Sequence, residues 1–238
     1  MKIGNIELNR ESLAQMMDYS ALNPDVTEEE IIRDCKVAKE YNFKGFHVNP
    51  VWVSTVAREL EGTRIETGLV ISFPFGTNPT NIKVEEAKDA VKVMDGRPAV
   101  IDMVTNVGKL KGKDYEYYKN DIAEVAKIAH AGGYECKAIL EVAFLTDDEI
   151  IKACELAAEA GADWVKTSTG RHGGPTLEQV ILMRKHSPKH VKVKVAGTGA
   201  FWTPMVTLGC LMAGAERIGT RRAPWIVDEL SKVLPEML

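Results

Sequence analysis

Short apolar runs alternate with amphipathic helical stretches along the chain, and this alternation constrains the fold more than any other feature. The runs predict strands near 17–20, 45–50, 66–73, 99–104 and 136–141, around Lys166, and at 190–196 and 216–220. The stretches between them predict helices at 31–38, 51–60, 78–94, 115–131, 147–160, 177–186, about 204–213 and 225–234, with a leading helix at 11–17. Strict alternation of strands and helices predicts a parallel sheet.

About eight such units in a chain of 238 residues fit a closed barrel, which typically needs about 250 residues as one unit. The alternative is an open doubly wound sheet, but the chain lacks a GxGxxG motif after its first strand. No linker-like or low-complexity stretch divides the chain. We therefore predict an α/β fold, a (β/α)8 TIM barrel, with residues 1–238 as one domain.

Composition limits the partners and the compartment. With 34 acidic against 30 basic residues, the formal net charge of −4 gives no general attraction to nucleic acid. No run approaches the roughly 20 apolar residues of a membrane span, and residues 1–8 lack the apolar core of a signal peptide. The four cysteines have no CxxC spacing and three lie in apolar patterns, which predicts reduced core thiols in a cytoplasmic protein. The cysteine and histidine spacings predict no metal site.

The stretch 163–170 holds the residue with the most distinctive chemistry. It begins as a short apolar run, reaches Lys166, and ends in small hydroxyl residues and Gly170. A lysine buried at a strand end tends to lose its proton, and a neutral amine can form a Schiff base with a carbonyl substrate. The alternative is a lysine that extends from the strand end to solvent, which is common for a lone strand lysine.

Other ionisable residues favour the functional interpretation. In a barrel, the C-terminal ends of the strands converge on one mouth, where the active site lies. Buried charges need partners, and titratable groups cluster at functional sites. The polar residues predicted at those ends are Asp18, His47, Asn49, Asp102, Glu141, Lys166, Thr169, Lys194 and Thr220.

Lys194 and Asp102 complete a set of reacting groups with Lys166. Strand alternation places Lys192 and Lys194 on one face, with Lys192 lower in the barrel or at solvent. A second ammonium near Lys166 lowers its pKa further. Asp102 is interpreted as a proton shuttle, as a counter-ion for a lysine, or as both. Two lysines and a carboxylate at separate strand ends are the groups that an amine-catalysed aldol reaction requires.

Several motifs together resemble the deoxyribose-phosphate aldolase family, from about residue 14 to the C-terminus. They are 165–170 (VKTSTG), 101–104 (IDMV), 139–141 (ILE), 193–197 (VKVAG), 17–18 with 22–23, 73–76 (FPFG) and 217–220 (RIGT). The resemblance implies a cytoplasmic, metal-free class I aldolase without a cofactor, which cleaves 2-deoxyribose 5-phosphate to glyceraldehyde 3-phosphate and acetaldehyde. The resemblance also implies a homodimer.

The resemblance also implies residue roles. Lys166 is the Schiff-base lysine, Lys194 the lysine that tunes it, and Asp102 the acid/base of the proton relay. Thr169 and Asp18 match positions near the substrate hydroxyls or the relay. Gly170, Gly197, Gly199 and Gly219 lie in the segments that approach the substrate, where successive amides can wrap a phosphate.

The chain departs from the family where the family holds phosphate. Residues 195–203 are longer than the family pattern, break its Gly-Gly pair and lack its arginine, whereas Arg171 and Arg221 are additional. Either these arginines contact a phosphate or carboxylate, or they fill or face away from that pocket and the substrate is a different aldehyde. Phe201 and Trp202 either cover the pocket or belong to the core or an interface.

Other departures concern proton transfer and leave rival functions. His47 stands where the family often has cysteine, and a lone histidine at a strand end is more often structural. The segment 231–238 lacks the family's terminal tyrosine, so proton transfer is expected to be arranged differently. The rivals are a lysine-dependent aldolase for another hydroxy-aldehyde or keto acid, a phosphosugar isomerase, and a non-catalytic sugar-binding barrel. Intact Lys166, Lys194 and Asp102 argue against the last.

Overall fold

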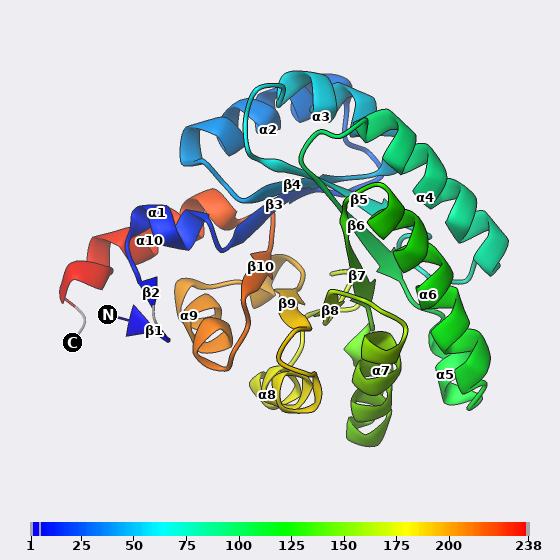
Figure 1. Cartoon of the computed structure of the whole chain (residues 1–238). Helices are drawn as coiled ribbons and strands as arrows, with labels where there is room; N and C mark the ends of the chain where they lie inside the picture. The colour runs from blue at the N-terminus through cyan, green and yellow to red at the C-terminus, as the bar shows by residue number, and fades with distance from the viewer. Residues whose placement is uncertain (1, 5, 237–238) are drawn as a thin grey trace.

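The computed structural model describes residues 2–4 and 6–236. Within them, eight parallel strands close into a barrel in the spatial order β10-β3-β4-β5-β6-β7-β8-β9, with helices around it (Figure 1). The predicted (β/α)8 barrel is confirmed. The barrel strands are β3 (Met17–Ala21), β4 (Gly45–Val48), β5 (Glu66–Ile71), β6 (Ala99–Val104), β7 (Glu135–Ile139), β8 (Trp164–Lys166), β9 (Lys192–Ala196) and β10 (Arg217–Gly219).

The helices begin where the sequence supplies caps. A capping box of Thr27 and Glu30 starts α2, and Thr146 and Thr176 start α7 and α8 in the same way. The helices are α1 (Arg10–Ala14), α2 (Glu28–Tyr41), α3 (Val53–Glu59), α4 (Thr80–Met94), α5 (Val107–Lys111), α6 (Tyr115–Ala131), α7 (Asp147–Glu159), α8 (Leu177–His186), α9 (Pro204–Met212) and α10 (Ala223–Val233). Short 3₁₀ turns are η1 (Pro50–Trp52), η2 (Val142–Phe144), η3 (Gly199–Phe201) and η4 (Leu234–Glu236).

The structure differs from the predicted elements mainly at their ends. The leading helix, predicted over 11–17, ends at Ala14, because the chain from Met17 onward pairs with β10 as strand β3. The strand predicted over 66–73 ends at Ile71, and Ser72 has a left-handed backbone with φ 53°. Helix α5 and an antiparallel hairpin of β1 (Lys2–Ile3) and β2 (Ile6–Glu7) were not predicted, because such short pieces show no periodicity. In the terminal segments considered above, Met1, Asn5, Met237 and Leu238 lie outside the described residues.

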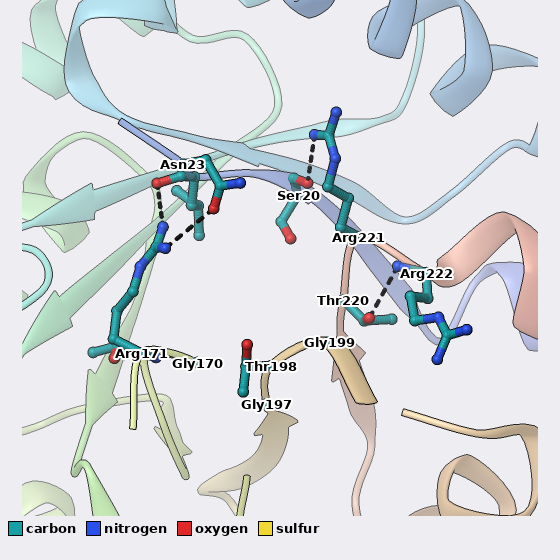
Figure 2. A pocket seen from close by; sticks show the side chains of 12 residues that line it. Ser20, Asn23, Gly170, Arg171, Gly197, Thr198, Gly199, Thr220, Arg221 and Arg222 are labelled. Carbon is teal, nitrogen blue, oxygen red and sulfur yellow. Dashed lines mark hydrogen bonds between the residues drawn. The ribbon is translucent and has the colours of Figure 1, made fainter. Parts of the chain in front are cut away.

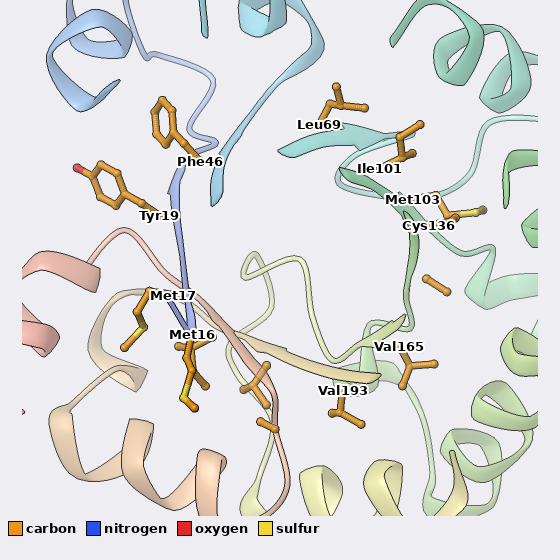
Figure 3. Close-up of a cluster of buried hydrophobic side chains, with 14 of the residues drawn as sticks. Met16, Met17, Tyr19, Phe46, Leu69, Ile101, Met103, Cys136, Val165 and Val193 are labelled. Carbon is orange, nitrogen blue, oxygen red and sulfur yellow. The ribbon is translucent and has the colours of Figure 1, made fainter. Parts of the chain in front are cut away.

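The apolar core lies between the barrel and the helices. Outward-facing strand residues gather there, as the close-up in Figure 3 shows; those labelled include Met17, Tyr19, Phe46, Leu69, Ile101, Met103, Cys136, Val165 and Val193. All four cysteines are buried and unpaired, as predicted for three of them. Burial raises the pKa of the Cys35 and Cys154 thiols to about 12, so they stay protonated at neutral pH.

The inside of the barrel is charged, although branched aliphatic residues usually fill such barrels. At its base, the ring of Trp164 lies about 5 Å from the cationic groups of Lys137, Lys192 and Arg217, at 5.0, 4.8 and 5.2 Å. Lys192 is half-buried there and its ammonium lies 2.7 Å from Glu135. The predicted placement of Lys192, on the same face as Lys194 but lower, is therefore correct.

Candidate active site

Lys166 ends strand β8 and points into the barrel. Its side chain is only 3% exposed, and its Nζ donates to Asp102 Oδ2 at 2.9 Å. Burial lowers the pKa of Lys166 from 10.5 to about 8, the nearby Asp102 carboxylate partly opposes this shift, and the Lys194 ammonium adds to it. A useful fraction of this amine is therefore neutral near physiological pH, as a nucleophile requires.

Lys194 lies beside Lys166 because β8 and β9 pair in register at these two residues. Its Nζ lies 3.0 Å from Asp102 Oδ2, the oxygen that also accepts from Lys166, and 2.7 Å from Asp18 Oδ2. Burial would lower the pKa of Lys194, but Asp102 and Asp18 outweigh it and raise the pKa above 10.5. Burial would raise the pKa of Asp102, but Lys166 and Lys194 hold it well below 3.8.

A deeper layer supports these groups. Asp18 on β3 is fully buried, with its Oδ1 2.8 Å from Arg217 and its Oδ2 3.4 Å from Lys137. Burial would raise the pKa of Asp18, but Lys137, Lys194 and Arg217 keep it well below 3.8. Asp18 contacts Lys194, as a residue of the predicted relay would. It also borders the small cavity that reaches Lys166.

Lys137 was not among the residues predicted for the site. This lysine sits on β7 between Cys136 and Ala138, is fully buried, and has its Nζ 3.7 Å from Asp102. Burial lowers its pKa, Asp18 opposes that change and Lys194 reinforces it. The sequence does contain a signal for Lys137: it is a lysine inside an apolar strand, the same feature that identified Lys166.

His47 on β4 lies against Lys194 and the two aspartates, although a lone histidine at a strand end is more often structural. Its Nε2 lies 3.0 Å from Lys194 Nζ, 3.3 Å from Asp102 Oδ1 and 3.7 Å from Asp18 Oδ2. Burial and the Lys194 ammonium lower the pKa of His47 to about 4, against the opposing pull of the two carboxylates. The imidazole is therefore neutral at physiological pH. We call Asp18, His47, Asp102, Lys137, Lys166, Lys194 and Arg217 the charged cluster.

Glycines on neighbouring strands make room for the charged cluster. A Cβ at Gly45 would lie 2.7 Å from Asp18 Oδ1, and one at Gly219 would lie 3.0 Å from Lys194 Cε. A Cβ at Gly68 would lie 2.3 Å from ring atoms of His47. Gly219, which was predicted to lie near the substrate, therefore also leaves space for the side chain of Lys194.

A funnel leads from the mouth to Lys166. Its upper part is a cavity of about 340 Å³, and its lower part, of about 40 Å³, reaches Lys166, Lys194 and His47. Both parts share Ser20, Leu22, Thr169 and Gly197, so they are continuous. Figure 2 shows the upper part, lined by Ser20, Leu22, Asn23, Thr169, Gly170, Arg171, Gly197, Thr198, Gly199, Thr220, Arg221 and Arg222.

The predicted substrate residues line this funnel. Thr169, Gly170, Gly197, Gly199, Arg171 and Arg221 border its upper part, and Asp18 and Gly219 border its lower part. Both arginines already have partners, as Figure 2 shows in part. Arg171 donates to Asn23 Oδ1 at 3.1 Å and to Leu22 O at 2.6 Å. Arg221 lies 3.0 Å from Asp34 Oδ2 and donates to Ser20 O at 3.4 Å.

Other predicted mouth residues support the loops. Trp202 is fully buried and its Nε1 donates to Gly197 O at 3.0 Å, whereas Phe201 packs against Gly197 and Gly174. Glu141, in a left-handed conformation with φ 55°, accepts a hydrogen bond from the Thr169 amide at 3.1 Å. Trp202 is therefore a core residue that holds the loop after β9.

A parallel barrel whose mouth opens onto buried ionisable side chains has the architecture of an enzyme. The family model of the DeoC/LacD family aldolases matches residues 12–200. A curated deoxyribose-phosphate aldolase of Thermococcus kodakarensis is 46% identical over 224 residues, which cover 93% of this chain and 98% of that protein. One from Clostridium novyi is 44% identical, covering 91% and 96% of the two chains.

The fold comparison agrees. The structure of a deoxyribose phosphate aldolase from Aeropyrum pernix, described as a unique tetramer, matches with a TM-score of 0.85 and 26% identity over 95% of this chain and 94% of that one. The chain belongs to the DeoC/LacD aldolase family and is a lyase. Within residues 2–4 and 6–236, no helix combines the length and apolarity that crossing a membrane would take.

Proposed function

We propose that this chain is a class I aldolase that reversibly cleaves 2-deoxy-D-ribose 5-phosphate to D-glyceraldehyde 3-phosphate and acetaldehyde, with Lys166 as the nucleophile. The observation that carries the proposal is a buried lysine at the base of the funnel, with its pKa lowered to about 8 and its Nζ 2.9 Å from Asp102. The family and the curated relatives support the reaction.

The geometry supports a sequence of proton and bond changes. Neutral Lys166 attacks the substrate aldehyde carbon, and loss of water gives an imine. The 3-hydroxyl then loses its proton, the C2–C3 bond breaks, and the electron pair moves into the enamine while glyceraldehyde 3-phosphate leaves. Protonation of the enamine carbon and hydrolysis release acetaldehyde and restore Lys166. Asp102 is within reach of Lys166 to exchange protons, and Lys194 holds a positive charge beside it.

The upper funnel suits the phosphate. Its lining includes Arg171, Arg221 and Arg222 and, among the described residues that border it, no acidic side chain. Half of its lining comes from the loops after β9 and β10, the seventh and eighth barrel strands, where barrels of this kind often bind phosphate. Because Arg171 and Arg221 already have protein partners, the amides of the 197–199 loop are proposed as the main phosphate ligands.

Borohydride reduction tests the nucleophile. Reduction with acetaldehyde should leave an ethyl adduct on Lys166, seen by mass spectrometry of peptides. Lys166→Leu should reduce turnover to less than about a hundredth, because covalent catalysis should be worth more than that. Lys192→Leu is the matched control, since Lys192 lies lower on the same barrel face as Lys194 and is half-exposed. An adduct on another residue with none on Lys166 would refute the assignment.

A charge change in the loop tests the phosphate site. Thr198 is exposed and borders the upper funnel. Thr198→Glu should raise KM for deoxyribose 5-phosphate at least tenfold and leave deoxyribose unaffected, because the added carboxylate repels only the phosphate. Thr198→Gln is the control, because glutamine has the size of glutamate but carries no charge. Equal effects on both sugars would favour an aldolase for an unphosphorylated hydroxy-aldehyde.

We also propose that the protein is a cytoplasmic homodimer. Buried, unpaired cysteines are compatible with a reducing compartment. Light scattering of the purified protein measures the oligomeric state, and a monomer or a tetramer would contradict the dimer.

A further inference from the structure

Lys166 and Lys194 form a nearly symmetric pair that must behave asymmetrically. They face each other across β8 and β9, both are buried, and both donate to Asp102 Oδ2, at 2.9 and 3.0 Å. The proposed reaction needs Lys166 without its proton and Lys194 with its proton. Their different surroundings must therefore determine which ammonium persists.

The partners of the two lysines differ in number. Among the described residues, the Lys166 ammonium has one acceptor within hydrogen-bond distance, Asp102. The Lys194 ammonium has three N–H groups and three acceptors at 3.0 Å or less: Asp18 Oδ2, Asp102 Oδ2 and His47 Nε2. The Lys194 ammonium thus lies close to as many acceptors as it has protons, whereas Lys166 loses a single contact when it is deprotonated.

The contact between His47 and Lys194 requires one tautomer of the imidazole. For Nε2 to accept from Lys194, the neutral His47 ring must carry its proton on Nδ1, because one ring nitrogen donates and the other accepts. The opposite tautomer could donate from Nε2 to Asp102 Oδ1 at 3.3 Å, but the same N–H would face the Lys194 ammonium at 3.0 Å. The Nδ1 tautomer removes that conflict and leaves Nδ1 without a partner among the described residues. The ring cannot move away easily, because it packs on the backbone of Gly68, where even a Cβ would lie 2.3 Å from it.

We propose that His47 is a positioning residue whose neutral imidazole accepts the third proton of the Lys194 ammonium and so keeps Lys194 charged while Lys166 becomes the free amine. The role rests on the proposed aldolase function of Lys166. Asp18 supplies part of the same bias, but it is shared with Arg217 and Lys137, whereas in the described structure the His47 ring has no cation other than Lys194 within hydrogen-bond distance.

The charged groups around Lys194 indicate which pKa should change when His47 is replaced. They come from β3 (Asp18), β4 (His47), β6 (Asp102), β7 (Lys137) and β8 (Lys166); further down, β10 adds Arg217, which pairs with Asp18 and with Glu66 on β5. Removing a neutral acceptor leaves all of these charges in place. It should make Lys194 easier to deprotonate while leaving Lys166 nearly unchanged.

The pH dependence of kcat/KM tests the proposal. In His47→Leu the alkaline limb of the pH profile should move to lower pH by roughly one to two units. This is the size expected for loss of one charge-assisted hydrogen bond. Its activity should fall between about pH 8.5 and 10, where the wild type keeps its activity, and its acid limb should stay in place. His47→Gln retains an acceptor oxygen, does not titrate, and should restore the alkaline limb. An unshifted limb in His47→Leu, or a Gln variant that behaves like Leu, would overturn the proposal.

A measurement on the unmodified protein covers the case in which the variants do not fold. Nitrogen-15 NMR of the labelled imidazoles should show one buried histidine at pH 7 with a protonated Nδ1 and an unprotonated Nε2 that couples to an ammonium. A protonated Nε2, or an imidazolium, would refute the proposal. This readout does not depend on turnover, so it separates failure of the His47 role from failure of the aldolase function.

Discussion

Replacing Asp102 by asparagine should separate imine formation from turnover. Asp102 opposes the lowering of the Lys166 pKa, because its carboxylate stabilises the ammonium. Asp102→Asn keeps the size of the side chain and an acceptor oxygen but removes the charge. The variant should therefore make Lys166 a better nucleophile at neutral pH, although it removes the group proposed to move protons.

The distances set the magnitude. Unit charges 2.9 Å apart interact by about 6 kcal/mol at an effective dielectric constant of about 20. The Asp102 carboxylate also interacts with Lys194 at 3.0 Å. We therefore expect its loss to destabilise the Lys166 ammonium by about a third of that energy, roughly 2 kcal/mol. That corresponds to between one and two pH units. The neutral fraction of Lys166 at pH 7 should rise from about a tenth to more than half.

The assay is the amount of borohydride-trapped acetaldehyde adduct at equilibrium, measured from pH 5 to 9, beside turnover of deoxyribose 5-phosphate. In Asp102→Asn the midpoint of trapping should fall by one to two pH units, whereas turnover should fall by about 10²- to 10⁴-fold. Thermal unfolding checks that the variant is folded. A midpoint that rises, or trapping that disappears together with turnover in a folded variant, would refute this account of the site.

Other expectations follow from the same structure. In the wild type, imine formation should increase about tenfold per pH unit up to pH 7 and level off above about pH 8, since neutral Lys166 is the reacting form; stopped-flow trapping measures this profile. Lys83→Met should lower the free energy of unfolding by about 3–5 kcal/mol in urea titrations, because it leaves the buried Asp121 without its cation, and adding Asp121→Leu should recover much of the loss. Gly219→Ala should reduce kcat/KM several-fold in steady-state assays with little change in stability, because its Cβ would press on Lys194 Cε.

The sequence predicted the barrel because strand and helix periodicities are local properties of the chain. It identified Lys166 and Lys194 because charged residues in apolar strands are conspicuous. It did not give the partners of Arg221, because the pairing with Asp34 on α2 joins residues far apart in the chain. Nor did it predict that His47 lies against Lys194, since that contact depends on strand order, register and the space left by Gly68.

Between Lys137 and Lys166, access rather than acidity should decide which lysine reacts. In the charged cluster four cationic side chains face the carboxylates of Asp18 and Asp102, and this excess of positive charge adds to the burial that favours loss of protons from Lys137 and Lys166. Burial lowers the pKa of both Lys137 and Lys166. Of these two lysines, Lys166 borders the lower funnel, whereas Lys137 lies beside the ring of Trp164. Borohydride trapping with acetaldehyde should therefore modify Lys166 and leave Lys137 unmodified, even at pH 9. An adduct on Lys137 in the folded wild type would show that proton loss, and not access, selects the nucleophile.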